Sequence, residues 1–128
     1  MESLPIKRRG VWKRVGKRVY LCATLGPEFD TAQRSLFAMS AAEGYAAQEK
    51  ALKEIECFLD ELQDEAKSSL APGERLMPRK SPGYGAMALS ENDEIIEILD
   101  ATRRIGVSAT RAHLLAPSKS VTAVCEII

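Results

Sequence analysis

RVYLCATL, residues 18–25, is an almost uninterrupted run of β-branched, aromatic and other apolar residues, and a Gly-Pro pair at residues 26–27 brings it to an end. This composition, with a turn signal behind it, predicts a β-strand. Asp30 or Thr31 can then cap a helix by accepting hydrogen bonds from its first free N–H groups. Beyond this cap, apolar residues recur at steps of three and four as far as Lys67, which predicts one long helix. A helix with such an apolar stripe needs a surface to cover, so we expect it to lie on a sheet.

The second half of the chain predicts shorter elements. They are a short strand at residues 76–77, a helix from Ser90 to about Gly106, and strands over 107–115 and 121–128, joined around Pro117. Within the preceding long helix, Gly44 indicates either a bend or a close contact between elements. The order strand, long helix, loop, helix, strand, strand predicts an α+β fold with helices packed on a largely antiparallel sheet.

Composition and charge limit the kinds of partner that we expect. The chain has 128 residues, which suits a single domain, and its 18 basic and 18 acidic residues leave no net charge. Basic residues nevertheless gather in residues 1–17, which we expect to be a basic lead-in to a domain over residues 18–128. The alternative for this stretch is a phosphate-binding arm or a docking surface for an acidic partner. We expect no nucleic-acid partner, because neither a helix-turn-helix nor an aromatic stacking pattern accompanies the basic residues.

The distribution of apolar residues also bears on location. No apolar stretch approaches the roughly 20 residues that are needed to span a bilayer, so we expect no membrane partner. The first ten residues carry early charges, and no apolar run resembling a signal peptide follows them. We therefore expect a cytoplasmic protein.

The residues that usually carry catalysis are sparse and poorly spaced. Three widely separated cysteines and the single histidine, His113, form no metal-binding spacing, so we expect no metal site. Ser118 and Ser120 lack a base partner, which argues against a nucleophile. Lys119 between them is either an anion ligand or a solvated loop residue. We expect no catalytic residues in this chain.

RKSPGYG, residues 79–85, is the segment best suited to approach a ligand. Arg79 offers a planar set of donors to a carboxylate or phosphate, and Tyr84 offers a ring face and a hydroxyl. Pro82 stiffens the segment, and Gly83 permits positive φ and close approach of the backbone. The alternative is an ordinary surface turn. Glu43 is a further candidate, either facing a ligand amine or exposed on its helix.

This loop and three other segments together resemble one protein family. The segments are ATLGPEFD (23–30), RKSPGYG (79–85), RRIGV (103–107) and PSKSVTAV (117–124). They resemble the activation domain of cobalamin-dependent methionine synthase, and still more the free-standing bacterial proteins related to that domain. The resemblance covers roughly Val19 to Val124, and the R-x-x-P-G-Y core followed by P-x-x-S-V is its most specific part.

The resemblance implies a function and a set of ligand contacts. Domains of this family bind S-adenosylmethionine, which remethylates a cobalamin whose cobalt has been oxidised and then reduced. The family motif that contacts this ligand corresponds here to Arg79, Ser81 and Tyr84, with Pro82 and Gly83 supplying the tight backbone between them. Arg79 would bind the methionine carboxylate, and Glu43 would pair with the amino group or the sulfonium. The cobalamin would belong to a partner, a cobalamin-dependent methyltransferase or other corrinoid protein, so this chain would be an accessory domain and not a complete enzyme.

Departures from the family pattern leave alternatives open. ATRA (109–112) replaces the usual Leu-Thr-Glu-Ser, and LAP (115–117) replaces a version that contains methionine. Family members also have amino-terminal helices that contribute to the ligand site and have no counterpart before Thr24. A second copy or a partner could complete the site. Alternatively, the chain is a degenerate structural or protein-interaction module that oligomerises and has lost ligand binding. A small hydrolase or transferase is the third possibility.

Overall fold

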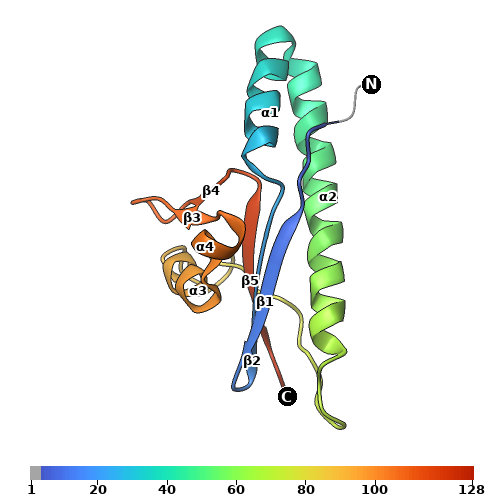
Figure 1. Cartoon of the computed structure of the whole chain (residues 1–128), viewed down its shortest axis with the longest axis vertical. Coiled ribbons are helices and arrows are strands. Elements are labelled where there is room, and N and C mark those ends of the chain that lie inside the picture. Colours follow the sequence, from blue (N-terminus) through green and yellow to red (C-terminus); the bar gives the residue numbers. More distant parts are fainter. Residues whose placement is uncertain (1–3) are drawn as a thin grey trace.

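The computed structural model of this chain describes residues 4–128, and its centre is a three-stranded antiparallel sheet with helices on both faces (Figure 1). The strand order is β1-β2-β5, with the bounds β1 Arg9–Val15, β2 Arg18–Thr24 and β5 Ser120–Glu126. The helices are α1 Pro27–Met39, α2 Ala41–Lys67, α3 Glu91–Leu99 and α4 Ala101–Ile105. Two short strands, β3 Ser108–Ala109 and β4 Leu115–Ala116, pair in a small hairpin. The expected α+β fold is confirmed.

Strand β2 lies in the middle of the sheet and is buried on both faces. Val19, Leu21 and Ala23 belong to a core that α2 closes on one face. Tyr20 and Cys22 belong to a second core that α3 and α4 close on the other face. Two covered faces explain why this strand is a continuous apolar run and does not alternate with polar residues. The strand predicted at residues 18–25 is therefore confirmed to within one residue.

The lead-in expected over residues 1–17 contains a strand of the sheet. β1 pairs with β2 from Arg9 opposite Thr24 to Val15 opposite Arg18. The basic residues hide the strand signal in the sequence, because only Val11 on this strand is fully buried. β1 is an edge strand, where charged side chains are common, and all of its residues except Val11 are partly or fully exposed.

Several of these basic residues form ion pairs inside the domain. Arg8 binds Glu54 and Glu61 of α2, and each N–O distance is 2.8 Å. Glu74 accepts hydrogen bonds from Arg14 at 2.7 Å and Lys17 at 2.8 Å, and these donors hold the pKa of its carboxyl well below its usual range. The basic stretch thus ties the β1–β2 hairpin to α2 and to the loop after it.

The helix predicted as one element over residues 31–67 is two helices. Ser40 separates α1 from α2 in an extended conformation, and its Oγ accepts a hydrogen bond of 3.4 Å from the Glu43 N–H. α1 and α2 consequently form a hairpin that extends beyond the sheet (Figure 1). The apolar repeat continues across the break, so periodicity gave no sign of it. The side chain of Ser40 provides the cap that starts the second helix.

Gly44 lies where the two helices approach each other closely, which is one of the two roles expected for it. A Cβ at this position would lie 2.3 Å from the Phe37 ring. The ring also makes an edge-to-face contact with Tyr45, with centroids 5.1 Å apart. Gly44 therefore acts through a close contact between helices.

We expect Gly44→Ala to lower the free energy of unfolding by about 1 kcal/mol. Overpacking against Phe37 costs about 1–3 kcal/mol, whereas the better helix propensity of alanine returns up to about 1 kcal/mol. Urea denaturation of both proteins measures the difference. Gly44→Ala in a Phe37→Ala background is the control, because the added methyl then has space and should be neutral or stabilising. An increase in stability from Gly44→Ala alone would contradict the close contact.

The predicted elements of the second half are recovered in part. The helix expected from Ser90 to Gly106 breaks at Asp100, which has φ 53°, and so forms α3 and α4. The strand expected over 107–115 is wrong, because residues 110–113 turn back and leave only two residues on each side in strands. The strand expected over 121–128 corresponds to β5. No helix within residues 4–128 is long and apolar enough to cross a membrane.

The segment that carries the 79–85 loop runs beside β5. Leu76 makes an isolated bridge with Ile127, so the short strand predicted at residues 76–77 is reduced to a single bridge. Lys80 exchanges two backbone hydrogen bonds with Val124, at 2.9 and 2.8 Å. This pairing fixes the start of the 79–85 loop to β5.

Candidate functional site

Two segments that are far apart in the sequence meet in one cleft, which we call the motif cleft. Its volume is about 360 Å³. Residues of the 79–85 loop form one side, and residues of the 117–124 segment form another. The lining residues are Ser81, Pro82, Tyr84, Leu89, Asn92, Leu114, Leu115, Ser118, Ser120, Val121 and Thr122. The structure therefore joins the two halves of the sequence pattern on which the family resemblance rests.

The loop side of the motif cleft is shaped by a tight turn at Gly83. Gly83 has φ 89°, and its N–H donates a 2.9 Å hydrogen bond to the Met87 carbonyl. Any other residue at position 83 would have to adopt this left-handed backbone conformation, and its Cβ would lie 3.1 Å from the Leu89 side chain. Tyr84 follows at the rim with 77% of its surface exposed. The turn thus needs glycine, and it leaves an aromatic ring available to a ligand.

The opposite side is held by side-chain hydrogen bonds to distant residues. Asp30, near the start of α1, accepts from the Ser118 N–H at 2.9 Å and from its Oγ at 2.6 Å. Ser120 Oγ lies 2.8 Å from Thr24 Oγ1 and 2.7 Å from the Pro117 carbonyl oxygen. These hydrogen bonds of the two serines position the segment.

Asn92 forms the polar floor of the motif cleft and was missed as a site residue. Its side chain is 3% exposed; Nδ2 donates to the His113 carbonyl at 2.8 Å, and Oδ1 accepts from Thr122 Oγ1 at 2.5 Å. In the sequence it stands among polar residues that indicate a helix start, so nothing local marks it as buried. It connects α3 to β5 and to the turn beside the cleft wall.

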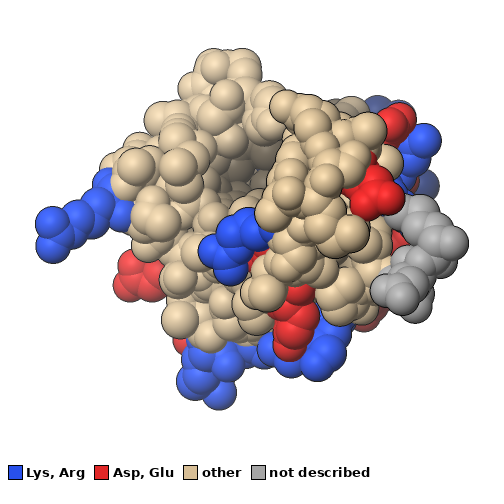
Figure 2. All heavy atoms as spheres, turned by 90° about the horizontal axis from the view of Figure 1, so that it is seen from above, with Lys and Arg blue, Asp and Glu red and all other residues tan. Residues whose placement is uncertain are grey.

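The chemistry of the motif cleft is neutral. Its lining contains hydroxyl, amide, aliphatic and aromatic groups and no charged side chain. A cleft with this lining suits a neutral group with one flat apolar face and several hydrogen-bonding atoms. Seen from above, the molecular surface has a hollow that is bordered mostly by uncharged residues, with basic side chains at one edge (Figure 2).

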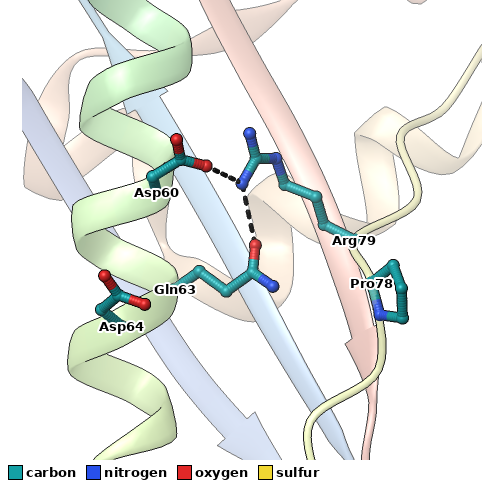
Figure 3. A pocket seen from close by; sticks show the side chains of 5 residues that line it. All are labelled: Asp60, Gln63, Asp64, Pro78 and Arg79. Atoms are coloured by element: carbon teal, nitrogen blue, oxygen red, sulfur yellow. Dashed lines mark hydrogen bonds and ion pairs between the residues drawn. The ribbon is translucent and has the colours of Figure 1, made fainter.

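Arg79 points away from the motif cleft and onto α2. Its Nη1 donates to Asp60 and to Gln63, each at 2.8 Å (Figure 3). Its Nη2 donates to Glu56, also at 2.8 Å. With Asp60, Gln63, Asp64 and Pro78 it lines a separate open cleft of about 560 Å³. The structure therefore places this guanidinium in a network with side chains of α2, and its expected contact with a ligand carboxylate stays a prediction.

Glu43 lies in the first turn of α2, where its side chain is exposed near the hairpin turn at Ser40. It lines neither the motif cleft nor the cleft beside Arg79. Of the six residues expected at the site, the structure brings Ser81, Pro82 and Tyr84 together around the turn at Gly83. Arg79 and Glu43 lie elsewhere.

The three cysteines differ in exposure. Cys22 and Cys125 are buried in the two cores, and burial raises their pKa values to about 12 and about 11. Cys57 is exposed on α2. Only Cys57 is therefore open to reagents in the folded chain.

The sequence matches no protein-family model and no curated protein. Function is therefore inferred from the clefts and their residues.

Proposed function

We propose that this chain is an S-adenosylmethionine-binding accessory domain for the reductive methylation of a cobalamin-dependent methyltransferase of the methionine synthase type. The observation that carries the proposal is the motif cleft, where the 79–85 loop and the 117–124 segment lie together. Its neutral lining, with Tyr84 at the rim, suits the adenosine part of this ligand. Ser81 and Ser118 line this cleft and would offer polar atoms to the ribose and the base.

The chain would contribute binding and orientation. The partner's cobalamin would supply the electron pair for the new bond to the methyl group, and the electrons of the broken sulfur–methyl bond would stay on sulfur. No acid or base is needed for this transfer, so a cleft without a nucleophile–base pair is compatible with it. The sites of both reactants must approach closely, so the open rim at Tyr84 would face the corrinoid protein.

We expect S-adenosylmethionine to bind the purified chain and Tyr84→Ala to weaken that binding about 5-fold to 150-fold. This range corresponds to the loss of one base–aromatic stack, about 1–3 kcal/mol. Isothermal titration calorimetry measures the dissociation constants. Tyr45→Ala is the matched control, because Tyr45 is also exposed but lies on α2 at the helical hairpin and outside the motif cleft. Binding that is unchanged in Tyr84→Ala would place the ligand elsewhere.

A second candidate function is an interaction module that has lost the ligand. The Arg79 network favours it, because three side chains of α2 already accept the hydrogen bonds that Arg79 would otherwise donate to a ligand. Absence of binding heat and of any ligand effect on the melting temperature, with a mass that rises with concentration, would favour this candidate over the first.

A further inference from the structure

The outer edge of β1 has no partner strand within residues 4–128 (Figure 1). Of the two edges of the sheet, the β5 edge is partly covered by the 76–80 segment, which bridges to Ile127 and Val124. In the described part of the chain, β1 makes no such bridge, and its backbone has no hydrogen bond besides the ladder with β2. An uncovered edge is a template on which another extended chain can form a strand.

The register of the sheet shows which residues of β1 carry the unpaired backbone groups. In an antiparallel ladder, alternate residues bond to one neighbouring strand, and the residues between them face the opposite side. Val124 of β5 directs both of its backbone hydrogen bonds outward to Lys80, which sets the alternation for all three strands. The outer edge of β1 therefore presents the N–H and C=O groups of Gly10, Trp12 and Arg14.

Two cationic side chains lie along this edge without a partner. Arg9 and Lys13 flank Val11, and all three point to the face of the sheet that α3 and α4 cover. Both cationic side chains are exposed, and neither forms a salt bridge within residues 4–128. The other basic residues of this stretch are paired with carboxylates: Lys7, Arg8, Arg14, Lys17 and Arg18.

We propose that the β1 edge binds an extended acidic segment of a partner protein, which joins the sheet as an additional strand. Residues that lie opposite each other on neighbouring strands point to the same face and interact through their side chains. The partner residues opposite Arg9, Val11 and Lys13 would therefore be acidic, apolar and acidic in turn. The resulting pattern, [DE]-x-apolar-x-[DE], is the same in both chain directions. Backbone hydrogen bonds supply affinity, and the two cations supply selectivity.

Other occupants match this edge less well. A second copy of β1 would bring three basic residues and no acidic one, and like charges on paired strands repel. A nucleic acid would satisfy the two cations but has no alternating amide groups to pair with the backbone of the edge. The edge shares no residue with the motif cleft, so this inference does not depend on the proposed function.

The side-chain part of the proposal is tested with a fluorescein-labelled peptide, TETVTET, whose binding to the full chain is followed by fluorescence anisotropy. We expect Arg9→Glu and Lys13→Glu each to weaken binding about 2-fold to 30-fold, because an attraction between opposite charges becomes a repulsion. The double variant should instead bind TKTVTKT, which the wild type should not bind. Lys50→Glu is the matched control, since Lys50 is exposed on α2, away from β1. Equal melting temperatures show that the variants are folded.

The backbone part is tested by hydrogen exchange and by N-methylated peptides. The amides of Gly10, Trp12 and Arg14 should exchange rapidly in the chain alone and slowly with TETVTET bound. N-methyl groups on one alternate set of peptide residues should abolish binding, and those on the other set should not, because only one set faces β1. Equal effects of the two sets, or equally tight binding of the scrambled peptide TEETTVT, would mean that the edge recognises negative charge alone, and the proposal would be wrong. Absence of binding at millimolar TETVTET would also overturn it.

Discussion

Replacing Leu59 by alanine is expected to lower the free energy of unfolding by about 2–5 kcal/mol. Leu59 is 1% exposed and lies on the face of α2 that covers the sheet, in one core with Leu21 and Ala123. The substitution removes the transfer free energy of the buried side chain and leaves a cavity that a sheet covered on both faces cannot readily close. Guanidinium denaturation, followed by circular dichroism, measures the loss.

Leu52→Ala is the control for this prediction. Leu52 lies on the same helix and is 49% exposed, so its removal should change stability by much less than that of Leu59. Similar losses at the two positions would show that α2 does not lie on the sheet by the face described here. The comparison thus tests the orientation of the longest helix, and with it the position of Arg79, which is bound to the same helix.

Asn92→Ala is expected to lower the free energy of unfolding by about 2–4 kcal/mol. It leaves the buried Thr122 hydroxyl and the His113 carbonyl without the partners that Asn92 provides, and each such loss costs about 1–3 kcal/mol. Because Asn92 is the floor of the motif cleft, the loss should also weaken binding of S-adenosylmethionine. Thermal and chemical denaturation measure the first effect, and calorimetric titration measures the second.

A double-mutant cycle with Thr122→Val shows whether the predicted network exists. If Asn92 and Thr122 share a hydrogen bond, the double variant should lose less stability than the sum of the two single losses, because the unpaired hydroxyl is no longer present. Strict additivity would mean that the two side chains do not interact. Asn92→Ala would then owe its effect to the His113 carbonyl alone.

The strands and helices that local composition marks strongly were predictable. The apolar run at residues 18–25 corresponds to β2, and the apolar repeat after residue 40 corresponds to α2. Their side chains are apolar because they fill the two cores, so burial leaves a direct trace in the sequence. The α+β fold follows from the order of these elements.

Elements whose signals conflict were not predictable. β1 carries basic residues on an exposed edge, and α1 joins α2 without a change in the apolar repeat. The turn at residues 110–113 depends on the Asp93–His113 and Asn92–His113 contacts, which link α3 to a distant loop. For β1 and for the turn at 110–113, contacts with residues far away in the chain contribute to the structure, whereas the break between α1 and α2 is marked only by the local cap at Ser40.

The candidate site divides in the same way. The turn at Gly83, the neighbouring Pro82 and the ring of Tyr84 are local features, and their chemistry can be stated from the residue types alone. The direction of the Arg79 side chain cannot be stated from the residue types, because it depends on which carboxylates of α2 lie within reach once that helix has packed on the sheet.

Residue order therefore specified the secondary structure of the core and the two motifs, because propensity, periodicity and turn chemistry act over a few neighbouring residues. Packing specified which of these residues meet. Packing placed Ser81 and Ser118 in the lining of one cleft and Arg34 and Lys119 in the lining of another. It also placed the Arg79 side chain against α2. Pairings of this kind arise from the burial of two sheet faces at once, a condition that no short stretch of sequence contains.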